Sequence, residues 1–291
     1  MPELPEVGVT RRAIDKTLVG RRIAHVKTTA PSYFFLTPPA RLRRALTERS
    51  VVELTRHGKY LVALLDDGAR LLLHLGMTGQ LFTAGARSVR LLSAERRSTL
   101  DPARQTAFRP DAHTHLELEF ADGPPGLYFR DTRKFGKVRL LAPGQSDPRL
   151  DKLGVDALVA TGEALHTAAR RRSVPIKSLL LEQSVIAGIG NIYADEALFL
   201  ARVRPTRASR RVAREECEAL VRAARRVLER AILKGGSSID DFVRPDGSDG
   251  EYQTERKVYA REGEPCPRCK TPIRRIVIGQ RSAHYCPSCQ R

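Results

Sequence analysis

The chain has 291 residues, of which 51 are lysine or arginine and 33 are aspartate or glutamate, so its formal net charge is +18. Hydrophobic residues make up 41% of the chain, a fraction that fits a folded protein and excludes a disordered one. The sequence contains no apolar run of membrane-helix length, and its start lacks the pattern of a secretory signal, so we expect a cytoplasmic protein.

The first half of the chain has mainly β patterns. Residues 10–18 have the apolar edge of a short helix, and the β-rich or alternating runs are residues 51–54, 60–65, 70–75, 115–120, 127–130 and 137–141. Between two of these runs, residues 84–110 are polar, arginine-rich and aperiodic, which favours a long surface loop.

The second half of the chain has mainly helical patterns. A boundary rich in Pro, Gly, Ser and Asp at 142–148 precedes it, and the helical runs are residues 175–183, 194–200 and 211–234. Gly235 and Gly236 end the last helix. We therefore predict an α+β chain with a β domain at 1–142, a helical domain at 149–236, a connector at 237–255 and a small cysteine module at 256–291.

The basic excess is divided almost evenly along the chain. Residues 1–150 carry 25 basic and 15 acidic residues, a net charge of +10, and residues 151–291 carry the remaining +8. This excludes a basic tail on a neutral enzyme and indicates that both halves face a polyanion, with nucleic acid as the leading candidate. A solvated arginine-rich surface and an anionic membrane surface are the alternatives, and no basic amphipathic helix favours the membrane.

Four of the five cysteines form two pairs near the end of the chain. They are Cys266, Cys269, Cys286 and Cys289, two CxxC motifs separated by 16 residues. This spacing predicts one tetrahedral structural Zn²⁺ site with no open coordination position. Two disulfides are the alternative, disfavoured by a reducing compartment. Cys217 stands alone in a helical run, and we expect it to be a buried apolar residue.

The second residue of the chain is a possible nucleophile. Removal of Met1 would make Pro2 a secondary α-amine, and α-amino groups have a pKa of about 7.7–8.0, so a useful fraction is unprotonated at neutral pH. Such an amine can attack a sugar C1′ and form an iminium ion. Glu3 and Glu6 are near enough in sequence to act as acids or charge stabilisers. The alternative is an ordinary helix start.

Six motifs spread along the whole chain resemble the formamidopyrimidine-DNA glycosylase family. They are Pro2-Glu-Leu-Pro-Glu-Val7, Gly58-Lys59-Tyr60, His74-Leu-Gly-Met-Thr-Gly79, Asp131-Thr-Arg-Lys-Phe-Gly136, the run from Ile186 to Glu196, and the cysteine module with Gln280-Arg281. The resemblance implies an N-terminal β-sandwich with a leading helix, a helix–two-turn–helix domain and a zinc finger. It also implies that damaged double-stranded DNA binds between these domains and that the enzyme is a monomer.

The resemblance also implies roles for four catalytic residues. Pro2 would attack C1′ of the damaged nucleotide, and Glu3 would donate the proton that helps to open the sugar and expel the base. Lys59 would serve β-elimination, and Arg281 would serve δ-elimination and hold a phosphate. The product would be a one-nucleotide gap with a phosphate at each end.

Eight further residues match DNA-contacting positions of the family. Base excision from a duplex requires the nucleotide to leave the stack, and flat or apolar side chains must fill the void. Met77, Arg133 and Phe135 have these properties and lie in glycine-flanked loops. The other matches are Glu6, His113, Arg172, Lys177 and Asn191. Each of four of these residues also has an alternative role: core packing for Met77 and Phe135, a solvated face for Arg172, and a helix cap for Asn191.

Four positions depart from the family pattern. Tyr252 stands where the family often has Phe, and Ala260 stands where it often has Gly. Thr114 follows His113 where the family usually has Asp, which leaves the local hydrogen bonding open. Gly8 stands where the family often has Glu, and glycine weakens a helix.

Three other functions compete with an oxidised-purine glycosylase. An oxidised-pyrimidine glycosylase similar to endonuclease VIII typically begins PEGPE and lacks the two loop motifs. This chain instead has Leu4 in its start motif and Met77 and Phe135 in those loops. A damage-binding protein without catalysis would not need Pro2 and Lys59. An RNA-binding zinc-ribbon protein fits the charge and the cysteines but leaves the N-terminus unexplained.

Overall fold

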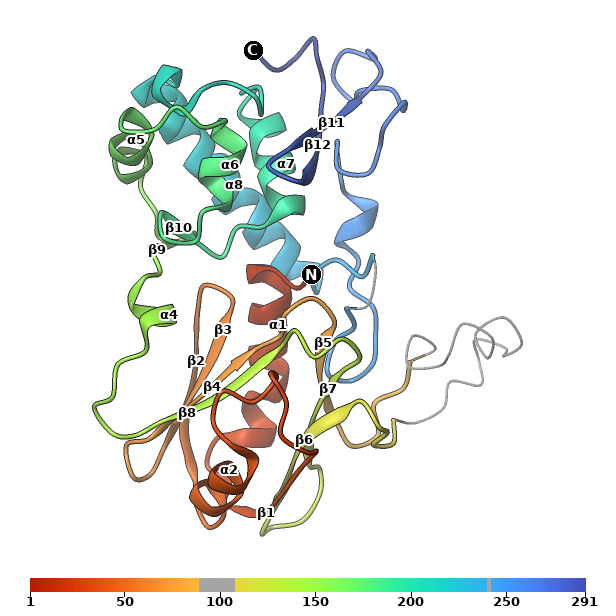
Figure 1. The fold of residues 1–291 in the computed structure, drawn as a ribbon. Helices are drawn as coiled ribbons and strands as arrows, with labels where there is room; N and C mark the ends of the chain where they lie inside the picture. The colour runs from red at the N-terminus through yellow and green to blue at the C-terminus, as the bar shows by residue number, and fades with distance from the viewer. Residues whose placement is uncertain (89–107, 240–241) are drawn as a thin grey trace. The chain divides into compact units, whose positions relative to one another are not determined.

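The computed structural model describes residues 1–88, 108–239 and 242–291. The chain forms two compact units (Figure 1): the first comprises Met1–Asp147 and Lys234–Glu251, and the second comprises Pro148–Leu233 and Tyr252–Arg291. Most of the arginine-rich stretch at 84–110 lies outside the described residues, so its prediction as a surface loop stays a prediction.

The first unit is built on two four-stranded antiparallel sheets (Figure 1). One sheet has the order β2-β3-β4-β8, with β2 Val51–His57, β3 Tyr60–Leu65, β4 Arg70–His74 and β8 Lys137–Leu141. The other has the order β1-β6-β7-β5, with β1 Ile23–Thr28, β6 Thr114–Phe120, β7 Leu127–Asp131 and β5 Gly79–Thr83. Apolar side chains of both sheets, such as Leu73 and Phe129, form one core cluster, which confirms the predicted β-sandwich.

Two helices accompany these sheets. Helix α1, Leu4–Leu18, begins six residues earlier than the apolar pattern predicts, because Glu3 is its N-cap and Pro5 stands in its first turn. Helix α2, Pro39–Leu46, is absent from the sequence prediction, and it buries Leu42 and Leu46 in the core of the sandwich. Its eight residues are too few to give a clear helical period, so the mainly β pattern of the first half did not reveal it.

The second unit is mainly helical. Its helices are α4 Pro148–Asp151, α5 Gly162–Arg170, α6 Ile176–Leu181, α7 Asn191–Leu200 and α8 Arg214–Leu233, with 3-10 turns η3 Ser209–Arg211 and η4 Tyr252–Thr254. The two short strands β9 Val155–Asp156 and β10 Ile186–Ala187 pair in parallel, and β11 Arg274–Ile278 and β12 Arg281–Tyr285 form an antiparallel hairpin. No helix in the described residues is long and apolar enough to cross a membrane.

Helix α8 shows why the second unit folds as it does. One face of the helix is buried, and Leu220, Ala224 and Leu228 recur on it at four-residue intervals. Cys217 lies on the same face and is fully buried, as predicted, and this burial raises the pKa of its thiol to about 11. The thiol is therefore an apolar packing group at neutral pH.

The segment after α8 packs with the first unit rather than with the helices. The Thr83 N–H donates to the Pro245 carbonyl at 3.2 Å, and Val243 lies in a cluster with Phe82 and Phe108. The contacts thus separate the units after Leu233, whereas the sequence predicts a domain boundary after Gly236. The bounds predicted for the helical domain (149–236), the connector (237–255) and the cysteine module (256–291) stay predictions.

Candidate active site and cysteine centre

The start of α1 is held by one carboxylate. Glu6 Oε2 accepts the backbone N–H of Glu3 at 2.8 Å, and Glu6 Oε1 accepts the backbone N–H of Ser237 at 2.9 Å. Pro2, Glu3 and Glu6 are all buried, while Met1 is 41% exposed. Both oxygens of Glu6 therefore position the first residues of the chain against segment Lys234–Glu251, and a DNA contact of Glu6 stays a prediction.

Lys59 lies in the turn between β2 and β3, one residue before β3 begins. Its side chain is 6% exposed. Arg56 of β2 donates from its guanidinium to the Gly58 carbonyl of this turn at 2.9 Å, and its Nε would lie 3.9 Å from a Cβ atom at Gly8 of α1, an ordinary contact distance. The strand that leads into the Lys59 turn thus lies beside the first turns of α1.

Two loops of the first unit meet around Asp131. The loop between β4 and β5 carries Met77, and the loop between β7 and β8 carries Arg133 and Phe135. The fully buried Asp131 accepts hydrogen bonds from Thr78 Oγ1 at 2.5 Å and from the backbone N–H of Gly136 at 2.6 Å. One carboxylate therefore fixes both loops that the sequence predicts to fill a void in the duplex.

The backbones of the two loops touch directly at Gly76. This residue has a φ of +63°, and a Cβ atom there would lie 2.4 Å from the backbone nitrogen of Gly136. No real side chain fits at that distance, so glycine is required for the approach. On the outer side, the Arg133 guanidinium lies 4.6 Å from the centroid of the Phe135 ring, and Phe135 is 40% exposed. These two side chains offer a flat, exposed pair.

A second set of hydrogen bonds holds the carbonyl groups of the Arg133–Phe135 loop. Lys137 Nζ donates to the carbonyl oxygens of Phe135 and Gly136 at 3.1 and 3.0 Å, and it also lies over the Tyr33 ring. The Tyr33 hydroxyl donates to the Arg133 carbonyl at 2.5 Å. The sequence analysis missed Lys137 and Tyr33, because no motif or spacing connects Tyr33 with a loop 100 residues later.

His113 lies in a short turn before β6. The neighbouring Asp111 accepts hydrogen bonds from the backbone N–H of His113 at 3.0 Å, from Thr114 Oγ1 at 3.1 Å and from Arg130 Nε at 2.9 Å. Burial alone would raise the pKa of Asp111, but the bond to Arg130 and the other donors lower it below its ordinary value. Thr114 therefore supports this turn as a donor, which answers the question left by its departure from the family pattern.

The DNA-binding residues predicted in the second unit lie in different surroundings. Arg172 pairs with Glu182 at 3.2 Å and remains 35% exposed. The Lys177 side chain is fully buried, where Nζ lies 2.5 Å from Asp195 Oδ1 and donates to the Ser282 carbonyl. Arg172 can still reach a phosphate beside its partner, whereas the Lys177 ammonium is enclosed and supports β12 instead. Phosphate binding by either residue stays a prediction.

Asn191 and Arg281 are tied to the same strand. Asn191 is the first residue of α7, and Gly190 is the N-cap, so the helix-cap alternative for Asn191 is wrong. Its Nδ2 atom donates to Ser282 Oγ at 3.3 Å. Arg281 begins β12, is exposed, and follows Gln280, which has a φ of +62°. The tight turn before Arg281 leaves its guanidinium free to meet an anion in solution.

The four cysteines of the terminal module lie together as predicted. Their Sγ atoms are all within 4.8 Å of one another, with separations of 3.9 Å for Cys266–Cys289 and 3.4 Å for Cys269–Cys286. A tetrahedral Zn²⁺ with bonds of about 2.3 Å needs sulfur atoms just under about 4 Å apart. Burial and the neighbouring thiols raise the pKa of Cys289 to about 12, whereas hydrogen bonds with Thr271 lower the pKa of Cys269 to about 6. The donor set fits zinc.

Comparison with known proteins covers every part of the chain. Three family models match: the formamidopyrimidine-DNA glycosylase N-terminal domain at residues 1–138, the formamidopyrimidine-DNA glycosylase H2TH domain at residues 153–243, and a zinc finger found in FPG and IleRS at residues 263–291.

Full-length relatives and solved structures agree with these models. Formamidopyrimidine-DNA glycosylases of Thioalkalivibrio sulfidiphilus and Thiobacillus denitrificans are 40% and 42% identical, each over 100% of both chains. The crystal structure of the Thermus thermophilus MutM (Fpg) protein matches 99% of this chain and 98% of its own, at 35% identity and a TM-score of 0.82. A complex between Lactococcus lactis Fpg and DNA that contains an abasic site matches 100% of both chains, at 33% identity and a TM-score of 0.84.

Proposed function

This chain belongs to the formamidopyrimidine-DNA glycosylase family of base-excision-repair glycosylases and AP lyases, and we propose that it removes oxidised purines from duplex DNA with Pro2 as its nucleophile. The substrates would be 8-oxoguanine and formamidopyrimidines. The single observation that carries the proposal is the fixed start of α1, where Glu6 holds Glu3 and Ser237 through two backbone hydrogen bonds. Such bonds keep the N-terminal amine in one place, which nucleophilic attack requires.

The first step needs a free secondary amine. With Met1 in place, the Pro2 nitrogen is an amide and cannot attack, so Met1 must be removed first. The amine then forms a bond with C1′ of the damaged nucleotide while the bond from C1′ to the base breaks and the base leaves with a proton. Glu3 would protonate the ring oxygen O4′, the sugar opens, and an iminium ion links the enzyme to DNA.

The strand is then cut by two eliminations. Loss of a C2′ proton expels the 3′ phosphate, and a second elimination expels the 5′ phosphate, which leaves a one-nucleotide gap with phosphates at both ends. We assign the first elimination to Lys59 and the second to Arg281. The nearly complete burial of Lys59 supports its assignment, since removal of a proton requires a positioned base with restricted access to water.

The two loops around Asp131 would keep the duplex open. Extrusion of a nucleotide costs a few kcal/mol of unstacking, and rigid side chains in the void recover part of that cost. Met77, Arg133 and Phe135 suit this task because their loops are held in place. The Asp131 carboxylate binds Thr78 of the first loop and Gly136 of the second, and Lys137 binds carbonyl groups of the second loop. The four cysteines hold one structural zinc ion that orders the hairpin bearing Arg281.

The same proposal covers where and in what form the protein acts. Its net charge of +18 supports action on DNA, and we propose that it acts in the cytoplasm as a monomer. An even distribution of the charge over both halves supports binding of the duplex by both units.

A borohydride trapping assay tests the proposed chemistry. We expect a covalent protein–DNA adduct with a duplex that contains 8-oxoguanine opposite cytosine, and N-terminal mass analysis should show that Met1 is absent and that the link is on Pro2. Pro2→Gly should lose most of the adduct, whereas Pro143→Gly in an exposed loop should keep it.

Three outcomes would contradict the proposal. Equal trapping by Pro2→Gly would exclude Pro2 as the main nucleophile, and preferred cleavage of thymine glycol would favour the oxidised-pyrimidine glycosylase. Tight binding of the damaged duplex with no adduct and no cleavage would favour a damage-binding protein.

A further inference from the structure

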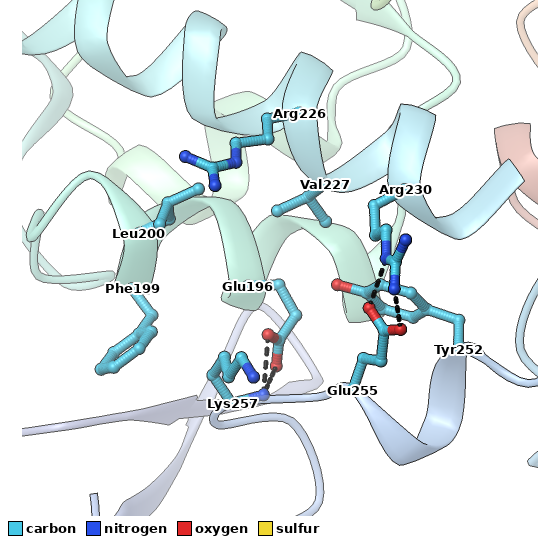
Figure 2. Close-up of a pocket in the computed structure, with 9 residues that line it drawn as sticks. All are labelled: Glu196, Phe199, Leu200, Arg226, Val227, Arg230, Tyr252, Glu255 and Lys257. Carbon is cyan, nitrogen blue, oxygen red and sulfur yellow. Dashed lines mark hydrogen bonds and ion pairs between the residues drawn. The ribbon is translucent and has the colours of Figure 1, made fainter. Parts of the chain in front are cut away.

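A small pocket of the second unit is not used by the proposed chemistry. It has a volume of about 160 Å³ and lies where α7, α8 and the segment after η4 meet (Figure 2). Its lining comes from Glu196, Phe199, Leu200, Arg226, Val227, Arg230, Tyr252, Glu255 and Lys257. All of these residues belong to the second unit, which the chain leaves after Leu233 and re-enters at Tyr252.

The wall of the pocket is mainly apolar. Phe199, Val227 and Tyr252 are each less than 10% exposed, and the Tyr252 ring also packs against Tyr193 with centroids 5.4 Å apart. Apolar cavities of about 150 Å³ bind a molecule of the size of benzene. The volume therefore suits one aromatic ring or a short branched alkyl group.

The acidic residues of the pocket already have hydrogen-bond partners. Glu196 Oε1 accepts backbone N–H groups of Val258 and Tyr259 at 3.0 and 2.9 Å, and its carboxylate also accepts the Lys257 N–H at 2.9 and 3.0 Å (Figure 2). Glu255 pairs with the Arg230 guanidinium through two hydrogen bonds. Neither carboxylate is therefore a binding site for a cation or an amine.

Two cations at the pocket have no such partner. Arg226 and Lys257 are exposed, and no described residue accepts a hydrogen bond or forms an ion pair with either side chain. Arg226 extends from α8 above Leu200 in the close-up (Figure 2). An apolar wall with two unpaired positive charges attracts a ligand that is apolar at one end and anionic at the other.

We propose that this pocket binds a small carboxylate with one aromatic ring or a short branched alkyl group, separately from DNA. The apolar group would pack between Phe199, Val227 and Tyr252, and the carboxylate would pair with Arg226 and Lys257.

Fluorine NMR of 4-fluorobenzoate with the full-length, zinc-loaded protein tests this inference. We expect a saturable shift that benzoate reverses, and that neutral benzamide and cationic benzylamine fail to reverse. Arg226→Gln and Lys257→Gln should each weaken binding about two- to fivefold, and the double variant about tenfold. Arg222→Gln is the matched control, since it removes an exposed charge from the same helix one turn away from the pocket.

A second variant tests the location. Val227→Phe fills the pocket and should abolish the shift, provided that its circular dichroism matches that of the parent protein. Three outcomes would overturn the proposal: no shift in the parent protein at millimolar ligand, equal competition by benzamide, or a loss in Arg226→Gln no larger than in Arg222→Gln. A folded Val227→Phe protein that still binds would also overturn it. None of these outcomes bears on the trapping assay.

Discussion

The loops that carry Met77 and Phe135 and the cysteine module at 263–291 are held in place in opposite ways. The loops are fixed by the chain itself. The Asp131 carboxylate accepts hydrogen bonds from the Thr78 hydroxyl of the first loop and from the Gly136 N–H of the second, and the Lys137 ammonium donates to carbonyl groups of the second loop. The cysteine module places four Sγ atoms within 4.8 Å of one another, which is a donor set that needs an ion to become a stable structure.

This difference shows two routes to a rigid site on a small number of residues. Internal hydrogen bonds need no bound ion, but the surrounding sheets must place every donor and acceptor. Here strands β7 and β8 place them. A metal replaces that network with about 10 kcal/mol or more of binding energy, and it makes folding of the module conditional on zinc. The following predictions test that contrast.

Loss of one zinc ligand should have the largest effect. Cys286→Ala leaves three ligands, and we expect the module at 263–291 to unfold while the β-sandwich keeps its structure. Affinity for damaged duplex should fall about 100-fold or more, because the Arg281 hairpin loses its support. Fluorescence anisotropy at fixed salt measures the affinity, and a zinc-release assay measures the metal.

Cys217→Ala is the matched control for that variant. Cys217 is also a buried cysteine, but it packs on α8 away from the cluster, so its removal should leave zinc content and DNA affinity unchanged. Full DNA affinity in Cys286→Ala protein that has lost its zinc would contradict a structural role for the metal.

Gly76→Ala should have the next largest effect, and it is confined to the loops. The new methyl group would collide with the backbone of Gly136 and also strain a positive φ, so we expect a loss of about 3 kcal/mol in the free energy of unfolding. Gly85→Ala is the control, since its φ is +87° but no atom lies within 4 Å of a new Cβ, and it should cost about 1 kcal/mol. Urea unfolding measures both, and equal losses would refute the steric argument.

Lys137→Met should have a moderate effect on catalysis. Removal of the ammonium frees the carbonyl groups of the loop that carries Arg133 and Phe135, and we expect kcat/KM on 8-oxoguanine duplex to fall about fivefold, or about 1 kcal/mol. Lys134→Met removes the same charge from the same loop without those hydrogen bonds. A similar fall in both variants would show that Lys137 contributes only charge.

Much of the fold was predictable from the sequence, for identifiable reasons. The strand patterns at 60–65 and 137–141 coincide with β3 and β8, because alternation and β-branched residues are local signals. The two CxxC motifs predicted the sulfur cluster, because ligand spacing is also local. The start of α1 was missed by six residues, since an acidic N-cap before a proline is a weak signal beside hydrophobic periodicity.

The support of the site was not predictable in the same way. Tyr33 and Arg133 are 100 residues apart, and only the pairing of the sheets brings them together. The burial of Lys177 against Asp195 also depends on tertiary packing, whereas its sequence pattern equally fits a solvent-facing phosphate ligand. Motifs thus predicted which residues take part, and the fold decides which of them reach solvent.

The smallest expected effect is a pH dependence that separates the two regions. Burial lowers the pKa of His115 below 6.5, while its Nε2 atom lies 2.9 Å from the Asp131 carbonyl, so the folded loops hold a neutral imidazole. When folding lowers the pKa of a histidine, the neutral side chain stabilises the fold at any pH above the pKa of the unfolded state, which is 6.5. This stabilisation is lost as the pH falls below 6.5 towards the pKa of the folded state. Asp111, whose pKa is lowered, stays ionised in this range.

We therefore expect the free energy of unfolding of the β-sandwich to fall between pH 7.5 and 5.5, and His115→Gln to reduce that slope. His25→Gln, at an exposed position of β1, is the control. Urea unfolding at fixed ionic strength measures the slope, with saturating zinc so that the cysteine module does not add its own proton release. If the slope in His115→Gln equals the slope in His25→Gln, the neutral imidazole does not stabilise the loops, and Asp131 must hold them without it.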